Sequence, residues 1–268
     1  MKNIKNTLLP VALAALLAPI FVIAQAPPAA YPTADLDNLV SRIALYPDPL
    51  LTQVLTAATF SDEIPEAARW ADQHSYLQGE QLARAIQEDQ LPWDPSVQAM
   101  LPFRNVLDMM ANDMGWTSSL GNAFLSQRDA VMDAVQRRRR QAVDYGYLRS
   151  NDQLAVDTSG GYIAIDPVNP GFIPVPAYDP GVVFVAPRPG VFVGGAVTFG
   201  GVSIDGAFAP WGWGVSRFDW GRHGVIVNNS PWERRWDNRG SYVHSYGPGV
   251  RRWEPAQRME QHEIHERP

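Results

Sequence analysis

Cysteine is absent from this chain of 268 residues, and lysine occurs only at positions 2 and 5. Without cysteine the protein has no disulfide framework, thiolate nucleophile, cysteine-ligated zinc, iron–sulfur cluster or lipid-modified N-terminal cysteine. A P-loop lysine, a kinase lysine and a Schiff-base lysine are excluded as well, because each requires a primary amine in the folded domain.

The two lysines precede an apolar stretch, residues 8–24, which contains two prolines. This order is typical of a secretory signal peptide, and the stretch is too short and too interrupted to span a membrane. We expect cleavage after Ala24 and a periplasmic protein without a lipid anchor. The remaining chain has 20 Arg against 28 acidic residues, a net charge of about −8. That charge argues against nucleic acid as a partner, and no later segment could span a bilayer.

Glycine is scarce in the first half, since only four of the 21 glycines precede residue 151. The sequence therefore predicts an α+β protein in which an all-α helical module precedes a small β-rich, Gly/Pro-rich segment and an Arg/Trp-rich, partly disordered tail. The expected segments are a signal peptide (1–24), a flexible leader (25–34), the helical module (35–150), the β segment (151–205) and the tail (206–268). We expect about the last 15 residues of the tail to be disordered.

Apolar residues in the helical module recur at i, i+3, i+4 and i+7. After Asp48-Pro49, which suits a helix N-terminus, this spacing is filled by Leu51, Val54, Leu55 and Ala58. Similar patterns predict helices over 65–74, 80–88, 103–114 and 116–143, and a short one after Asp94-Pro95.

Short β-type runs follow at 161–167, 171–180, 181–185, 191–193 and 224–227. Pro174 and Pro176 restrict the second run to an edge strand or an extended polyproline-like segment.

Three blocks carry a family resemblance. They are residues 44–55 (ALYPDPLLTQVL) with 67–70 (AARW), residues 93–97 (WDPSV) with 116–117 (WT) and 120–125 (LGNAFL), and residues 173–180 (IPVPAYDP). In this order they resemble the DUF3300 family of bacterial exported proteins over roughly residues 36–185. The resemblance implies export and a helical module, and it supplies no catalytic residue because the family's function is uncharacterised.

The tail interleaves tryptophan with arginine, and flat indole faces beside guanidinium groups suit stacking on sugar rings or contact with a protein partner. The alternative is that these tryptophans pack against the helical module. The candidate binding residues are Trp211, Trp213, Trp220, Trp232, Trp236, Arg217, Arg222, Arg234 and Arg235.

Four consecutive arginines, Arg137, Arg138, Arg139 and Arg140, fall near the end of the last predicted helix. At about 100° per residue they surround most of the helix, which predicts exposure on nearly all sides. They are either a solvated helix end favoured by the helix dipole, or a docking site for acidic polysaccharide, phospholipid head groups or a partner's carboxylates.

No motif in the chain identifies a catalytic or metal site, and we expect no cofactor. The adjacent carboxylates (Asp62-Glu63, Glu88-Asp89, and Asp35 with Asp37) have no context that separates them from solvated helix ends. Residues 262–265 (HEIH) are one residue shorter than the zinc-binding H-E-x-x-H pattern, and no G-x-S-x-G is present.

The leading hypothesis is a non-catalytic cell-envelope protein that docks a glycan or a protein through the tail and the arginine run. The alternative is an envelope hydrolase whose carboxylates or histidine meet only in three dimensions. A structural partner that becomes ordered only in a complex is a third possibility. The sequence leaves the oligomeric state open.

Overall fold

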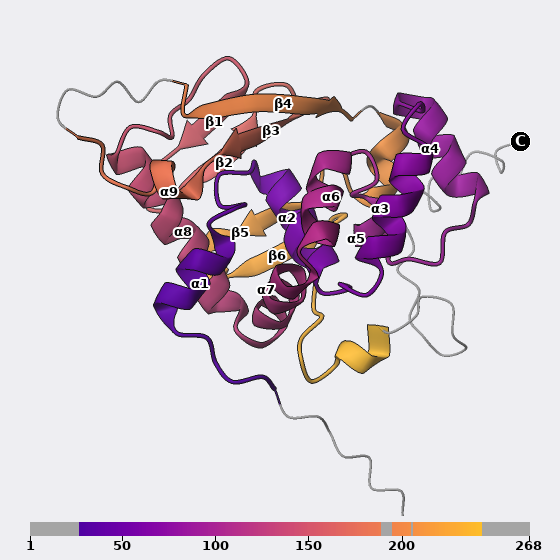
Figure 1. Ribbon diagram of the computed structural model, residues 1–268, viewed down its shortest axis with the longest axis horizontal. Coiled ribbons are helices and arrows are strands. Elements are labelled where there is room, and N and C mark those ends of the chain that lie inside the picture. The colour runs from indigo at the N-terminus through magenta and orange to yellow at the C-terminus, as the bar shows by residue number, and fades with distance from the viewer. Residues whose placement is uncertain (1–26, 189–194, 205, 243–268) are drawn as a thin grey trace, which may run out of the picture.

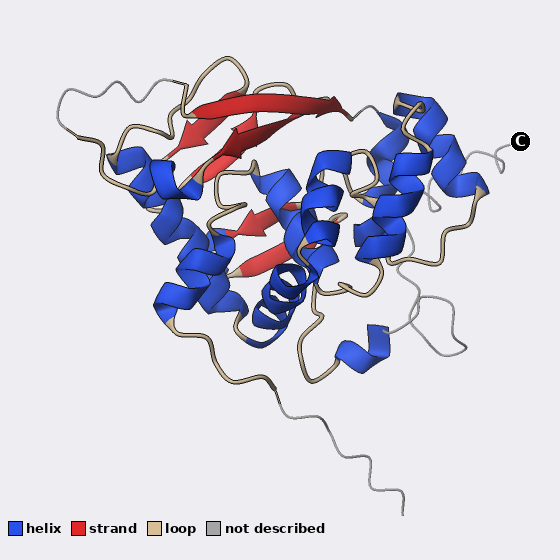
Figure 2. Ribbon diagram, in the orientation of Figure 1, coloured by secondary structure: helices blue, strands red, loops and turns tan. Residues whose placement is uncertain are grey.

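The computed structural model describes residues 27–188, 195–204 and 206–242, and it shows the predicted α+β organisation (Figures 1 and 2). Helices make up the first half, and short antiparallel strands follow. The predicted signal peptide and the last residues of the tail lie outside the described residues. The helices are α1 (Thr33–Val40), α2 (Asp48–Ala58), α3 (Ile64–Gln73), α4 (Gly79–Glu88), α5 (Pro95–Gln98), α6 (Arg104–Asn112), α7 (Met114–Ser126) and α8 (Arg128–Asp144).

Helix α2 lies at the centre of the molecule, and all of its residues except Pro49 are buried. It contacts α5 and α7 on the helical side, and β2, β5 and β6 on the other. Its buried hydroxyls are satisfied locally, since Thr52 donates to the Asp48 carbonyl and Thr56 to the Thr52 carbonyl. Gly121 of α7 lets the two helices touch, because a Cβ there would lie 2.0 Å from the Ala58 carbonyl oxygen.

The single long helix predicted over 116–143 is wrong, because the chain breaks between α7 and α8. Gln127 leaves the helical conformation, at φ −139° and ψ 42°. Its side-chain oxygen accepts a hydrogen bond from the Tyr31 amide at 2.7 Å, and its amide group donates to the Tyr31 carbonyl. The apolar spacing continues across the break, so periodicity alone could not reveal it.

Two small antiparallel sheets follow the helices. Strands β1 (Leu154–Asp157) and β2 (Ala164–Pro167) pair with each other, and β3 (Phe172–Tyr178) pairs with β4 (Val197–Ser203). The edge position predicted for the Pro174/Pro176 segment is confirmed. The β-type run at 181–185 is wrong, because Asp179 accepts a hydrogen bond from the Gly181 amide and Pro180 starts the short helix α9 (Pro180–Val183). The run at 191–193 lies outside the described residues.

The first part of the tail folds back onto the helices and completes the core. It forms a three-stranded antiparallel sheet of β5 (Arg217–Asp219), β6 (Gly224–Val227) and β7 (Ser230–Pro231), together with short 3-10 helices at Gly206–Trp211, Trp220–Arg222 and Arg239–Tyr242. Strands β5 and β6 lie behind α2 in Figure 1 and contact it. No helix in the described part of the chain is long and apolar enough to cross a membrane.

Candidate functional site: a groove along α8

The arginine run lies on α8, and its four members have different surroundings. Arg139 points inward and is 0% exposed, so the expectation of exposure on nearly all sides is wrong at this residue. Its guanidinium donates to the carbonyls of Ala44, Tyr46 and Ile163, and to Oδ1 of Asp48 at 2.6 Å. With these bonds to protein groups, Arg139 has a structural role and is unavailable to a ligand.

Asp48 links this arginine to the tail. Its second oxygen, Oδ2, accepts a hydrogen bond from Trp220 Nε1 at 2.8 Å, and the Trp220 ring lies 5.0 Å from the Arg139 guanidinium carbon. Each guanidinium nitrogen and each carboxylate oxygen of this buried ion pair therefore has a hydrogen-bond partner, and an indole covers the pair, as a charge pair in a protein interior requires.

Arg137 and Arg138 attach α8 to α1. The Arg137 guanidinium binds the Asp37 carboxylate through Nε and Nη2, at 2.9 and 2.7 Å. Arg138 donates to the Asp37 carbonyl and to the Asn38 and Gln141 side chains, and its guanidinium lies over the Phe184 ring. Arg137 is thus already charge-compensated, and Arg138 has most of its donors satisfied.

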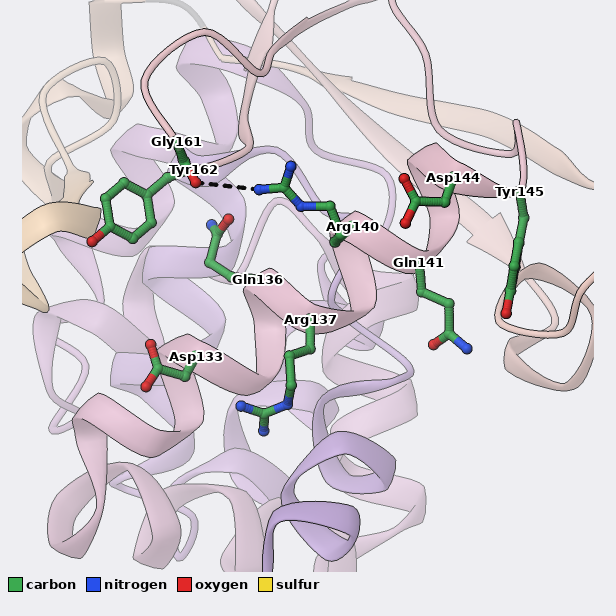
Figure 3. Close-up of a pocket in the computed structure, with 9 residues that line it drawn as sticks. All are labelled: Asp133, Gln136, Arg137, Arg140, Gln141, Asp144, Tyr145, Gly161 and Tyr162. Atoms are coloured by element: carbon green, nitrogen blue, oxygen red, sulfur yellow. Dashed lines mark hydrogen bonds between the residues drawn. The ribbon is translucent and has the colours of Figure 1, made fainter.

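Arg140 is exposed, and within the described part of the chain it makes a single hydrogen bond, to the Gly161 carbonyl at 3.2 Å. It lies in an open groove of about 510 Å³ that follows α8 (Figure 3). The groove is lined by Asp133, Gln136, Arg137, Arg140, Gln141, Asp144, Tyr145, Gly161 and Tyr162.

The two glutamines of the groove form hydrogen bonds that attach neighbouring segments of the chain to α8. Gln136 exchanges two hydrogen bonds with the Ile163 backbone, and Gln141 donates to the Phe184 carbonyl and accepts from Arg138. They fix the β1–β2 turn and the α9 end of the β segment against α8. A ligand would therefore meet Arg140 and the side chains without a hydrogen bond among the described residues: Asp144, Tyr145 and Tyr162.

A histidine–aspartate pair lies beside the groove, where Asp133 lines it. His223 Nε2 lies 2.9 Å from Asp133 Oδ1, and His223 adopts a left-handed backbone at φ 51°. A Cβ added to nearby Gly221 would lie 3.8 Å from the Tyr162 ring. The tail therefore borders the groove through this pair, although the predicted binding tryptophans do not line it.

The charges of the groove balance, with two arginines and two aspartates. Asp133 and Asp144 are eleven residues apart on one helix, or about 16 Å along its axis. A glycosidase holds its two carboxyl groups about 5–9.5 Å apart, so this pair does not have that geometry. Among the described residues, no group of three or more His, Asp or Glu side chains could hold a metal ion.

A second charged cluster lies where the tail meets α3 and α5. Arg234 is buried, donates through Nη1 to the carbonyl and hydroxyl of Thr59, and lies 3.6 Å above the Phe60 ring. Nearby, the Glu63 carboxylate accepts a hydrogen bond from the Asp94 amide at 2.7 Å. Burial raises the pKa of Glu63 to about 7, against the opposing effects of that hydrogen bond and of Arg234.

The carboxylate of Asp94 caps the N-terminus of the helix that follows it, α5. It accepts hydrogen bonds from the Ser96 amide and hydroxyl at the N-terminus of α5, and burial raises its pKa. Each of the other two pairs has one member in a contact within the fold, since Asp89 accepts from Trp70 Nε1 and Asp37 binds Arg137. None of these pairs faces the α8 groove.

The candidate binding residues of the tail differ in how far they are buried. Trp211, Trp213 and Trp220 are buried, with their indole nitrogens bonded to Gln98, Ala99 and Asp48. Trp232 and Trp236 are half-buried, and Trp232 stacks on Phe124 with ring centroids 5.4 Å apart. Arg234 is buried, and the exposed members are Arg217, Arg222 and Arg235.

The chain belongs to the family described as "Protein of unknown function (DUF3300)", whose model matches residues 32–253. It is also 32% identical over 187 residues to the uncharacterized protein YacH of Escherichia coli (strain K12). That match covers 58% of this chain and 30% of YacH, so the chain spans less than a third of that relative's length. No solved structure matches the chain.

Proposed function

We propose that this protein is an exported, non-catalytic binding protein of the cell envelope and that the α8 groove binds an acidic glycan. The proposal rests on Arg140. Its exposed guanidinium has one carbonyl partner and lies in a groove between two tyrosines. The N-terminal sequence supports export to the periplasm, since it has the charge and apolar order of a signal peptide.

The groove has the chemistry that a sugar carboxylate requires. Arg140 retains donors in the forked geometry that binds a carboxylate through two oxygens. Tyr162 is 38% exposed and lies at one end, and Tyr145 lies at the other (Figure 3). Aromatic faces of this kind pack against the apolar faces of sugar rings, and their hydroxyls can bond to ring substituents. A volume of about 510 Å³ is in the range of small-molecule sites, which fits one or two sugar units.

Binding is favoured over hydrolysis by the placement of the carboxylates. The carboxylates of the groove are too far apart for an acid–base pair, and Asp94 caps α5 through its Oδ1. Glu63 has the raised pKa of a catalytic acid, but its carboxylate accepts the Asp94 amide within a contact between elements of the fold. We propose that the same polymer, or a protein partner, makes secondary contacts with the exposed tail residues Arg217, Arg222 and Arg235.

Titration calorimetry with peptidoglycan fragments and with uronic-acid oligosaccharides tests the proposal. We expect saturable binding that Arg140→Gln weakens at least tenfold and that Tyr162→Ala also weakens. Arg84→Gln is the control, because Arg84 is also an exposed helical arginine, on α4 and outside the groove. Equal binding by Arg140→Gln and the wild type, or no binding of either ligand class, would reject the groove as the site.

Export is tested separately by cell fractionation of the full chain and of a version without residues 1–24. We expect the full chain in the periplasmic fraction, shortened by its leader, and the truncated version in the cytoplasm. Recovery of the full-length chain in the cytoplasm would contradict export.

A further inference from the structure

Strand β4 forms one edge of its two-stranded sheet, and its register with β3 shows which backbone groups that edge presents. Pro174 and Pro176 of β3 lie opposite Gly201 and Phe199. Proline has no N–H, so these two pairs are the non-hydrogen-bonded pairs of the antiparallel ladder. The N–H and C=O groups of Gly201 and Phe199 therefore point away from β3. By the same alternation, those of Val197 and Ser203 do so too.

Strand β4 lacks the features that usually prevent an edge strand from pairing with another chain. Natural edge strands are protected by charged residues, prolines, bulges or short length. Strand β4 has the sequence VTFGGVS, without charge or proline, and pairs with β3 through seven consecutive residues without a bulge. No other strand in the described ranges pairs with it. In contrast, the proline-containing β3 cannot offer a complete ladder on its own outer edge.

We propose that β4 pairs antiparallel with β4 of a second copy of this chain, about a two-fold axis at Gly200. The outward groups are self-complementary about that residue: Val197 faces Ser203 of the second copy, and Phe199 faces its Gly201. All four outward positions of each copy then form hydrogen-bonded pairs, and the two sheets join into one of four strands. Because no residue of β4 is charged, this pairing places no like charges opposite each other within the two strands.

The side chains next to the axis favour the same pairing. The Phe172 ring already lies over Gly201, where an added Cβ would be 2.0 Å from ring atom Cζ. In the proposed dimer, Phe199 of the second copy enters beside that ring on the same face of the sheet. Two symmetric aromatic contacts over glycine would form, a pairing that stabilises glycine-containing strands.

Gly200 allows the dimer to be tested without disturbing the monomer, because a Cβ on Gly200 would meet nothing within 4 Å. In a non-hydrogen-bonded pair, the two residues at the axis have Cα atoms about 4.5 Å apart. Gly200→Lys would therefore place two like charges directly opposite each other in the dimer only. Gly160 is the matched control, since it also has open space at its Cβ and lies in the β1–β2 connection, outside β4.

Sedimentation velocity from low micromolar to several hundred micromolar protein gives the first readout. We expect the wild type and Gly160→Lys to dimerise with increasing concentration. Gly200→Lys and Gly200→Glu should each dimerise at least about fivefold more weakly, as expected for about 1 kcal/mol of like-charge repulsion. An equimolar mixture of these two variants should dimerise again. A wild type that stays monomeric throughout, or a Gly200→Lys variant that dimerises equally well, overturns the proposal.

The absence of cysteine from the chain permits a second, covalent readout. Gly200→Cys should form a disulfide-linked dimer on mild oxidation, because the opposed Cβ atoms lie within disulfide distance, and Gly160→Cys should not. If Gly200→Cys cross-links in envelope extract to a different protein and never to itself, a foreign strand occupies the edge and the self-pairing is wrong. Neither readout depends on the α8 groove, so this proposal and the proposed function can fail independently.

Discussion

Arg139 Nη1 lies 2.6 Å from Asp48 Oδ1, joining residues 91 positions apart in a buried ion pair. The pair connects the central helix α2 with α8, and Trp220 of the tail completes its hydrogen bonds. The first family block and the arginine run, which are distant in the sequence, thus form one structural unit. Their shared role is to hold the fold together around a buried charge.

Breaking this ion pair should lower the stability of the folded protein. Removal of one partner from a buried ion pair leaves an uncompensated charge, with a typical loss of about 3–5 kcal/mol. We expect Arg139→Met and Asp48→Asn each to lower the free energy of unfolding by that amount in urea denaturation. Arg140→Gln, one position further along the same helix, should change it by less than about 0.5 kcal/mol. Equal effects at positions 139 and 140 would contradict the inward orientation of Arg139.

The indole of Trp220 should contribute through its hydrogen bond as well as its packing. Trp220→Phe keeps a ring but leaves Asp48 Oδ2 without its donor, and such a loss costs about 1–3 kcal/mol. A double-mutant cycle with Asp48→Asn should give a coupling energy above about 0.5 kcal/mol, as expected for residues in contact. Strict additivity of the two substitutions would show that the hydrogen bond does not contribute.

The contact between α2 and α7 should depend on Gly121. A Cβ at this position would lie 2.0 Å from the Ala58 carbonyl oxygen, so Gly121→Ala must separate the two helices or distort them. We expect at least about 2 kcal/mol of destabilisation, measured by thermal and urea unfolding. Gly115→Ala is the control in the same helix, because its Cβ would meet only Asp113 Oδ1 at 3.8 Å. This control should leave stability unchanged or raise it by up to about 1 kcal/mol.

Glu63 should make stability depend on pH. Burial raises its pKa from 4.5 to about 7 in the folded protein, so the folded state binds more protons than the unfolded state between these values. Stability from this residue is therefore complete below about pH 4.5 and is lost as the pH rises through 7. We expect Glu63→Gln to stabilise the protein at pH 8 by about 1–3 kcal/mol relative to the wild type, with little difference at pH 4.5. A constant difference between the two proteins from pH 4.5 to pH 8 would contradict the raised pKa.

Local signals predicted much of the helical half and failed where tertiary contacts decide. The Asp48-Pro49 start and the apolar spacing that follows gave α2, and the two prolines gave the edge position of β3. The break at Gln127 rests on hydrogen bonds to Tyr31, 96 residues away, which no window of sequence contains.

Only part of the candidate site could be predicted from the sequence. The Arg run marked the correct helix, but the inward turn of Arg139 depends on acceptors in the distant segments around residues 44–48 and 163. The sequence does contain one signal for the groove. Gln136, Arg140 and Asp144 recur every four residues, as do Asp133, Arg137 and Gln141, which places two polar stripes side by side on α8. Tyr162 comes from the β segment, and only the fold brings it there.

The contact between Trp220 and Asp48 also constrains when the protein can fold. Until residue 220 has been synthesised, the Arg139–Asp48 pair lacks its indole cover and α2 lacks the strands that bury its second side. A chain growing from its N-terminus therefore completes its native core only after Val227, the last residue of β6, has been synthesised. Under the proposed export, a core completed this late would leave the chain without its native core during most of its synthesis.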